Sequence, residues 1–228
     1  MKKILVVLTN INHYHGTDDP TGLWLGEAAE FVAVMQTAGI QVDYVSPKGG
    51  FVPLDPRSMK YTNQEIMKVY ETDDFQRRAL SNSLNPDQVN AADYTAIYYT
   101  GDHGVMWDFP DNPELQRIAL TIYQNNGFVT SVCHGVAGLL NIKDSNGDYL
   151  ITNKTITGFT AAEEAIAAKR SVVPFLNKPE VEKHGGHWRQ KRFYSEFAVQ
   201  DGQLITGQNP FSATAVATRL IQNLQVNQ

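Results

Sequence analysis

Short apolar runs alternate along this chain with longer segments of helical periodicity, and this alternation restricts the fold more than any other feature. Ile4–Leu8 is continuously apolar, and Phe128–Val132 is a short run rich in β-branched residues. Such runs are typical of strands that are covered on both faces. Between them, residues 23–38 carry apolar side chains at helical spacing and end at Gly39, a common C-terminal helix cap. Alternating strands and helices predict an α/β fold, with a parallel sheet sandwiched by helices.

Further elements follow from the same patterns. Asn112-Pro113 places a capping residue before a proline at the first helical position, which predicts a helix to about residue 125. Asp201-Gly202 between two strand-like runs predicts a C-terminal hairpin. The polar segment 51–90 interrupts the alternation and is interpreted as a small inserted cap within one domain, residues 1–228. The other expected elements are strands at 40–46, 94–100 and 155–160 and helices near 73–80, at 161–170 and at 212–224.

The composition excludes several classes of protein. A net charge of −5, with Arg189-Gln190-Lys191-Arg192 as the densest basic patch, gives no reason to expect nucleic acid or an anionic membrane as partner. A single cysteine excludes an internal disulfide and fits a reducing compartment. The N-terminal apolar run is too short for a signal peptide, and no segment reaches the ~18 apolar residues of a membrane span. We therefore expect a cytoplasmic protein.

That single cysteine, Cys133, follows directly after the strand expected at 128–132. The small and apolar residues after Cys133-His134-Gly135 indicate the start of a helix. A side chain at such a sharp strand-to-helix turn projects beyond the sheet edge, as in a nucleophile elbow. A helix N-terminus also favours thiolate over thiol. The alternative is a buried cysteine that packs as a small hydrophobic residue.

Two other segments lie near the carboxyl ends of the predicted strands, where ligands of such sheets bind. The first is Gly101-Asp102-His103-Gly104, whose backbone N–H groups could face a bound oxygen, although for this segment taken alone a tight turn is the better explanation. The second contains Glu27, early in the first helix. Glu27 either complements the helix dipole or carries protons beside the thiol.

Six motifs follow one another along the chain. They are Thr21-Gly22 with Glu27, Ser46-Pro47-Lys48-Gly49-Gly50, Gly101-Asp102-His103-Gly104 with Trp107-Asp108-Phe109-Pro110, Val132-Cys133-His134-Gly135, Ile156-Thr157-Gly158-Phe159-Thr160 and Thr206-Gly207-Gln208-Asn209-Pro210-Phe211-Ser212-Ala213. Taken together, these residues resemble the ThiJ/PfpI superfamily, and within it the branch of heat-shock chaperone-like, glutathione-independent glyoxalases (glyoxalase III). The resemblance extends from Ile4 to about Arg219 and implies a class I glutamine amidotransferase-like, flavodoxin-like sheet.

The resemblance implies a role for individual residues. Cys133 matches the family nucleophile and His134 the adjacent histidine of its triad. Glu164 matches the acid that orients this histidine, with Glu163 as the alternative if the register differs by one residue. Glu27 matches the glutamate that hydrogen-bonds the thiol.

The oxyanion donors implied by the resemblance are the backbone N–H groups of Asp102 and His134. Asp102 departs from the commoner Gly-Gly-His-Gly, and its carboxylate would disfavour an oxyanion unless it is turned away. The substrate pocket is expected to include Gly101, His103, Trp24 and Trp107.

The implied reaction converts methylglyoxal or glyoxal to lactate or glycolate, and it also allows protein deglycase activity. Cys133 adds to the aldehyde, His134 or Glu27 moves the proton, and the resulting thioester is hydrolysed. No cofactor and no metal are expected, because His13 and His15 lack the cysteine pair of common zinc sites. The expected partner is a small dicarbonyl aldehyde, and the acidic surface is compatible with a homodimer.

Three other functions can be compared with this one. A holdase chaperone would use apolar surface, for which Trp24, Trp107, Phe109 and Trp188 are candidates. A redox sensor would oxidise the lone thiol to sulfinic acid. Glutamine amidotransfer is disfavoured, because His184 and His187 are not followed by the glutamate of a His-x-Glu motif.

Overall fold

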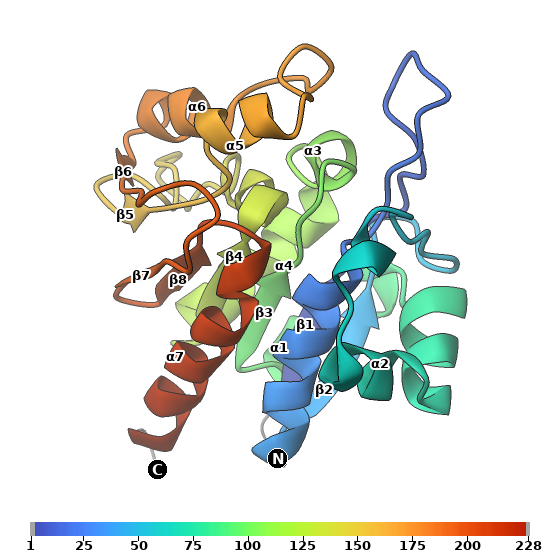
Figure 1. Ribbon diagram of the computed structural model, residues 1–228. Helices are drawn as coiled ribbons and strands as arrows, with labels where there is room; N and C mark the ends of the chain where they lie inside the picture. The colour runs from blue at the N-terminus through green and yellow to red at the C-terminus, as the bar shows by residue number, and fades with distance from the viewer. Residues whose placement is uncertain (1–2, 227–228) are drawn as a thin grey trace.

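The computed structural model describes residues 3–226, which form a six-stranded sheet in the order β2-β1-β3-β4-β8-β7 (Figure 1). All neighbouring strands are parallel except β7 and β8, which form the predicted hairpin. The strands are β1 (Lys3–Val7), β2 (Gln41–Val45), β3 (Ala96–Tyr99), β4 (Phe128–Val132), β7 (Ala198–Asp201) and β8 (Leu204–Gly207), with β5 (Thr155–Ile156) and β6 (His187–Trp188) in a separate pair.

Helices cover both faces of this sheet, which confirms the α/β prediction. The α-helices are α1 (Leu25–Thr37), α2 (Gln64–Tyr70), α3 (Val105–Asp108), α4 (Pro113–Gln124), α5 (Ala161–Ile166), α6 (Asn177–Lys183) and α7 (Ala213–Val226). The other helical segments are η1 (Ser58–Tyr61), η2 (Phe75–Ser81), η3 (Pro86–Gln88), η4 (Ala91–Asp93), η5 (Cys133–Leu139) and η6 (Pro210–Ser212).

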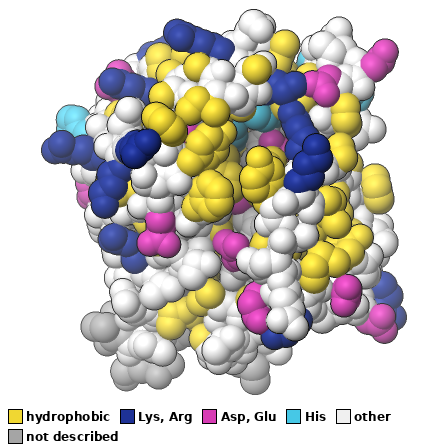
Figure 2. All heavy atoms as spheres, viewed as in Figure 1, with side chains coloured by type: hydrophobic (Ala, Val, Ile, Leu, Met, Phe, Trp, Pro, Cys, Tyr) yellow, Lys and Arg dark blue, Asp and Glu magenta, His cyan; other side chains and the backbone are white. Residues whose placement is uncertain are grey.

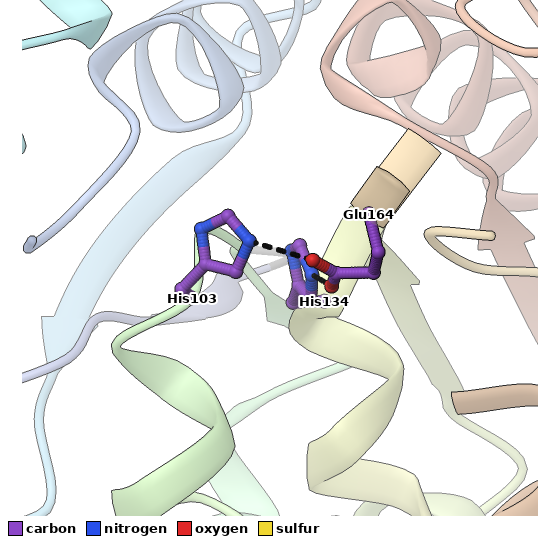
Figure 3. A group of neighbouring side chains, drawn as sticks. All are labelled: His103, His134 and Glu164. Carbon is purple, nitrogen blue, oxygen red and sulfur yellow. Dashed lines mark hydrogen bonds and ion pairs between the residues drawn. The ribbon is translucent and has the colours of Figure 1, made fainter. Parts of the chain in front are cut away.

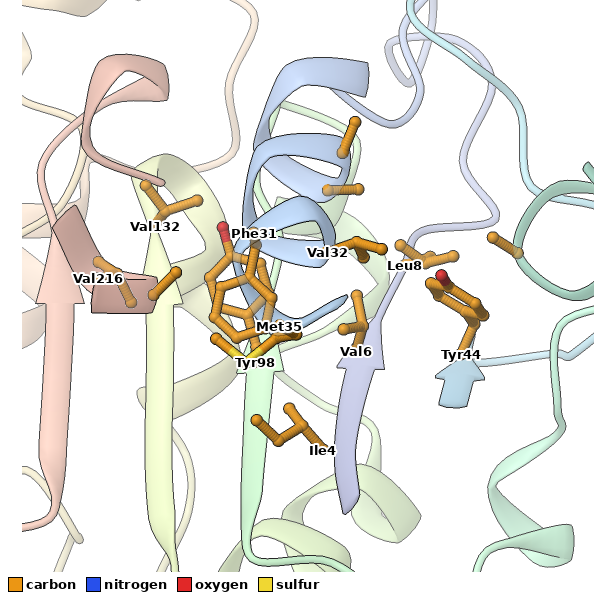
Figure 4. Packing of buried hydrophobic residues seen from close by; sticks show 14 of the residues in the cluster. Ile4, Val6, Leu8, Phe31, Val32, Met35, Tyr44, Tyr98, Val132 and Val216 are labelled. Atoms are coloured by element: carbon orange, nitrogen blue, oxygen red, sulfur yellow. The ribbon is translucent and has the colours of Figure 1, made fainter. Parts of the chain in front are cut away.

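The two faces of β1 explain why its sequence is apolar throughout. Ile4 and Val6 belong to the core beneath α1 and α7, where Phe31 stacks on Tyr98 with ring centroids 3.7 Å apart (Figure 4). Leu5 and Val7 belong to the core on the opposite face. Because successive strand side chains point to opposite faces, both sets must be apolar.

Several predicted boundaries need correction. The segment 155–160 contributes only two residues to a strand, and the helix expected over 161–170 ends at Ile166. The helix near 73–80 is a π-helical turn. In the hairpin Asp201 pairs with Leu204, so its loop is Gly202-Gln203, one residue later than predicted. Gly202 adopts φ +60°, which favours glycine.

Segment 51–90 packs beside α1 and β2 and contains α2, which the sequence patterns did not reveal. Single bridges join Leu23 to Leu54 and Val45 to Leu84. Among the described residues, no helix combines the length and the apolar character needed to cross a membrane.

Candidate active site

Cys133 lies where β4 ends and the helical turn η5 begins, as the sequence predicts. Its φ of +58° is rare for a residue with a side chain and is typical of a nucleophile elbow. The close approach of η5 to β3 requires Gly135, because a Cβ there would lie 2.3 Å from the Tyr99 carbonyl oxygen. The turn therefore holds the thiol at the carboxyl edge of the sheet, where it is 2% exposed.

A hydrogen-bonded chain leads from the thiol to a carboxylate on α5. Cys133 Sγ lies 3.3 Å from His134 Nδ1. On the other side of the ring, His134 Nε2 lies 2.5 Å from Glu164 Oε1 (Figure 3). Glu163 instead closes a capping box with Thr160 at the start of α5. Of the two neighbouring glutamates, Glu164 is therefore the one that orients the histidine.

His103 contacts the second oxygen of the same carboxylate, with Nε2 3.1 Å from Glu164 Oε2. Its Nδ1 faces the Tyr14 hydroxyl at 2.8 Å and Asp102 Oδ1 at 3.2 Å. Burial acts to lower the pKa of His103, but the hydrogen bonds that its ring donates to the two carboxylates outweigh burial and raise that pKa to about 9. His103 is therefore an imidazolium at neutral pH.

The positive charge of His103 lowers the pKa of His134, whose ring centroid is 4.3 Å from that of His103. Burial and the neighbouring cation lower the pKa of His134, so the ring is neutral and can accept a proton. For Glu164, burial raises the pKa, but the two histidines outweigh it and hold the pKa below its usual range.

Glu27 reaches the thiol from α1. Its Oε2 accepts the Gly101 N–H at 2.6 Å, and its Oε1 has no hydrogen-bond partner among the described side chains and backbone groups. A Cβ on Gly101 would lie 2.6 Å from Glu27 Oε2 and 2.8 Å from Cys133 Cβ, so only glycine fits between acid and thiol. Burial raises the pKa of Glu27, which favours the neutral acid.

The expected preference for thiolate is wrong for the resting site. The backbone N–H groups of Asp102 and His134 do bond the sulfur and lower the pKa of Cys133. Burial raises that pKa by more, and the charge of Glu27 adds to this increase when its carboxyl is ionised. The following element is also a 3-10 helix of seven residues rather than a long α-helix with its dipole. The resting cysteine is therefore a thiol beside a neutral imidazole.

The Asp102 carboxylate is turned away from the thiol. Asp102 has φ +86°, a left-handed conformation that explains why glycine is commoner at this position and that Asp tolerates better than most residues. Its Oδ1 accepts the His103 N–H at 2.7 Å, and Oδ2 accepts the Thr21 hydroxyl at 3.4 Å.

A second carboxyl, Asp55, bonds the Asp102 side chain. Burial and this neighbouring carboxyl raise the pKa of Asp55 to about 6, against the opposing effect of Arg57. Arg57 also donates to the Tyr14 hydroxyl at 2.8 Å. Sequence reasoning missed Tyr14, Asp55 and Arg57, because they lie in irregular segments without a motif.

The thiol opens into a cavity of about 620 Å³. Figure 2 shows hydrophobic side chains on both sides of a hollow in this face, with histidine visible between them. Trp24 and His103 line it as predicted, and Gly101 lies behind, between Glu27 and Cys133. The residues lining it are Trp24, Gly26, Glu27, Glu30, Arg57, Lys60, Tyr61, Ile66, Asp102, His103, Cys133, His134, Phe159, Ile166, Ala167, Tyr194, Pro210 and Phe211.

Trp107 is a wrong prediction for this cavity. It does not line the cavity, because α3 directs it toward the first loop. There its ring packs edge-on against Tyr14 at 5.8 Å and lies 4.9 Å from the ring of His15.

One group of described residues has donor atoms close enough for a metal ion. Atoms of His103, His134 and Glu164 lie within 4.8 Å of one another. Each of the three already hydrogen-bonds another member of the group, which is the arrangement of a proton-transfer site. His13 bonds its neighbour Asn12 and does not join this group.

The geometry agrees with comparisons to known proteins. The chain is 32% identical over 237 residues to the Saccharomyces cerevisiae protein named glutathione-independent glyoxalase HSP31, covering 98% of each. The structure of glyoxalase III from Candida albicans matches with a TM-score of 0.88 and 30% identity, covering 97% of this chain and 96% of that one. Rapid Encystment Protein 24 KDa from Francisella tularensis matches with a TM-score of 0.95 and 36% identity, covering 98% and 99%. A model of the DJ-1/PfpI family matches residues 25–223, and the chain belongs to this family.

Proposed function

We propose that this protein is a cysteine-dependent, glutathione-independent glyoxalase that converts methylglyoxal to lactate and glyoxal to glycolate. The observation that carries the proposal is the hydrogen-bonded chain from Cys133 through His134 to Glu164 at a cavity that also contains Glu27. The names of its relatives in Saccharomyces cerevisiae and Candida albicans support the same activity.

The first step follows from the protonation states at the site. Neutral His134 takes the thiol proton through Nδ1 as the sulfur adds to the aldehyde carbon. The new oxyanion forms beside the N–H groups of Asp102 and His134, which already face the sulfur. His134 then returns the proton to this oxygen, which leaves a neutral hemithioacetal and a neutral base. Covalent capture divides one difficult step into easier ones.

The second step moves hydrogen within the substrate. His134, or Glu27 in its ionised form, removes the hydrogen of the former aldehyde carbon as a proton, and the electron pair forms an enediolate with the adjacent carbonyl. The same base returns that proton to the carbonyl oxygen, which gives the enediol. The neutral Glu27 carboxyl is suited to protonate the adjacent carbon and to take up the hydroxyl proton of the sulfur-bearing carbon, which gives a Cys133 thioester and restores the acid. Water hydrolyses this thioester, so the sum is one methylglyoxal plus one water to one lactate, without an external oxidant. Such proton transfers typically contribute about 10²–10⁴-fold in rate.

His103 and Glu164 support this base without touching the sulfur. The His103 imidazolium and ionised Glu164 compensate each other, and the cation keeps His134 neutral and able to accept protons. We assign His103 a positioning and electrostatic role at the wall of the cavity.

The test is lactate formation from methylglyoxal by purified protein, with and without added glutathione. We expect turnover that needs no glutathione. Absence of lactate in the reaction without glutathione would overturn the proposal. Release of unmodified arginine or lysine from a glycated peptide would add the deglycase activity to it.

The holdase alternative receives less support. Of its candidate aromatic residues Phe109 is fully buried, and Trp107 packs on the first loop. Suppression of client aggregation by the Cys133→Ala variant would favour that alternative, because a holdase does not need the thiol.

A further inference from the structure

The cavity beside Cys133 is much larger than the smallest 2-oxoaldehydes require. A volume of about 620 Å³ is in the range of pockets that hold drug-sized ligands. Methylglyoxal has three carbons and two oxygens, and both carbonyl groups must lie at the thiol and its bases. Its methyl group would leave most of this cavity unoccupied.

The unused part of the cavity is apolar and uncovered. Six large hydrophobic side chains are exposed among the described residues, and three of them line this cavity. These three are Tyr61 (59% exposed), Ile166 (54%) and Phe211 (51%). Exposed apolar groups gathered at one site, rather than scattered singly, mark a surface that a ligand or partner covers.

The aromatic residues that line this cavity form two groups of neighbouring rings, which we call its two walls. Trp24 and Tyr61, at the start of α1 and the end of η1, have ring centroids 5.4 Å apart. On the other wall Tyr194 lies 6.1 Å from both Phe159 and Phe211.

Phe159 connects this second wall to the reactive end. Its ring lies 4.3 Å from that of His134, so aromatic surface extends continuously from the triad histidine to the rim. A substituent that extends from the reacting carbonyls along this surface would contact the aromatic rings over the whole length of the substituent.

The charged groups of the lining are already engaged or lie at the rim. Arg57 pairs with Asp55 and donates to Tyr14. Burial raises the pKa of Glu30, which bonds Thr214. Lys60 is exposed. The interior of the cavity therefore offers a substituent mainly apolar and aromatic surface.

From these observations we infer that the site takes 2-oxoaldehydes with a large apolar substituent, an aryl group or a long alkyl chain, which the Trp24–Tyr61 and Phe159–Tyr194–Phe211 walls bind. The inference rests on the proposed glyoxalase function and names the substrate class of the same site. The two carbonyls react at Cys133, and the substituent extends toward the rim.

The test compares kcat/KM for methylglyoxal, 2-oxooctanal and phenylglyoxal, each in glutathione-free buffer. We expect kcat/KM for each of the two larger substrates to exceed that for methylglyoxal by at least about tenfold. This factor is the lower end of what one methylene contributes in an apolar pocket. Tyr61→Ala and Phe211→Ala are each expected to reduce the ratio of phenylglyoxal to methylglyoxal severalfold.

Phe51→Ala is the matched control, because Phe51 is 70% exposed and does not line the cavity. It is expected to leave the ratio unchanged. Turnover of methylglyoxal with equal or lower kcat/KM for the larger substrates would overturn the inference and leave the proposed function intact. Failure to convert any of the three would instead overturn the proposed function. A ratio that falls equally in Phe51→Ala and the wall variants would also contradict the inference.

Discussion

At the scale of single residues, the site depends on one carboxylate shared by two histidines in different protonation states. Glu164 bonds neutral His134 through one oxygen and the His103 imidazolium through the other. His103 Nδ1 faces a carboxylate oxygen of Asp102 and Nε2 faces one of Glu164; because carboxylates only accept hydrogen bonds, the doubly protonated ring donates at both positions. The cation therefore lowers the pKa of the neighbouring base, His134.

His103→Gln should change the pH dependence of turnover. The charge of His103 lowers the pKa of His134, so its removal raises that pKa, and Glu164 then acts on His134 alone. Because the base must be neutral, the acid limb of kcat/KM should move to higher pH, by about one unit. The measurement is kcat/KM as a function of pH between pH 5 and pH 9, a range that includes the ordinary His pKa of about 6.5.

Two variants make this prediction specific. Asp102→Asn removes one of the two charges that keep His103 protonated and should move the acid limb in the same direction, by less. His184→Gln replaces another buried histidine, which bonds the Leu140 carbonyl outside the cavity, and should leave the limb in place. An unchanged limb in His103→Gln would show that His103 is merely structural.

The sequence predicts residues that belong to regular elements better than residues of loops. Cys133 follows a strand-like run, and Glu27 lies on a periodic helix, so their positions at the sheet edge could be expected. Tyr14, Asp55 and Arg57 reach the site from irregular segments, and no local pattern relates them to His103. The raised pKa of Cys133 could not be predicted either, because it depends on burial in the folded protein.

At the scale of elements, α5 is fixed by Glu163 so that Glu164 can face the histidines. Glu163 accepts hydrogen bonds from the backbone N–H and hydroxyl of Thr160, and from the Tyr194 N–H. The side-chain amides of Gln208 and Asn209 also donate to it. One buried carboxyl thereby joins the first turn of α5 to two loops.

Glu163→Ala should therefore destabilise the fold. It leaves several buried donors without an acceptor, which should lower the free energy of unfolding by about 3 kcal/mol. For a chain of this size the melting temperature should fall by about 6–12 °C. Thermal unfolding followed by circular dichroism measures this shift.

Glu164→Gln is the matched comparison at the adjacent position. It keeps the size of the side chain and one acceptor for a histidine, so its melting temperature should fall by less than that of Glu163→Ala. Its turnover should fall by about 10²-fold or more, since the base is no longer oriented by a charge. A larger thermal shift in Glu164→Gln would contradict the assignment of the two glutamates.

The same scale shows which elements a sequence pattern reveals. β1 and β4 were predicted to within a residue because burial on both faces leaves a run of apolar or β-branched residues. α2 and α6 were missed because each has seven residues and buries only two of them, too few for a helical period.

At the scale of the whole molecule, the sheet order brings together residues from distant parts of the chain. The carboxyl ends of β3 and β4 place Asp102 and Cys133 side by side. Helix α1 brings Glu27 to the thiol, and α5 brings Glu164 to His134. The fold could be predicted because strands alternate with helices. The packing of the segment between β2 and β3 beside α1 could not be predicted, because the apolar residues of this segment have no regular spacing.

The assembled site should work without a metal ion. His103, His134 and Glu164 satisfy one another by hydrogen bonds, and the proposed steps need only protons and a thiol. Dialysis against a strong chelator should leave kcat/KM for methylglyoxal unchanged, as measured against protein dialysed in buffer alone. Loss of activity that added zinc restores would contradict this expectation.

The central claim is that the Cys133 thiol forms the covalent bond to the substrate. Its most direct test compares lactate formation from methylglyoxal, without glutathione, by the wild-type protein and by Cys133→Ser. Equal melting temperatures of the two proteins establish that the variant is folded. Serine fits the same turn but is a much poorer nucleophile, so we predict that lactate formation falls to the background rate of buffer. Turnover by Cys133→Ser at a rate similar to the wild-type protein would contradict the account.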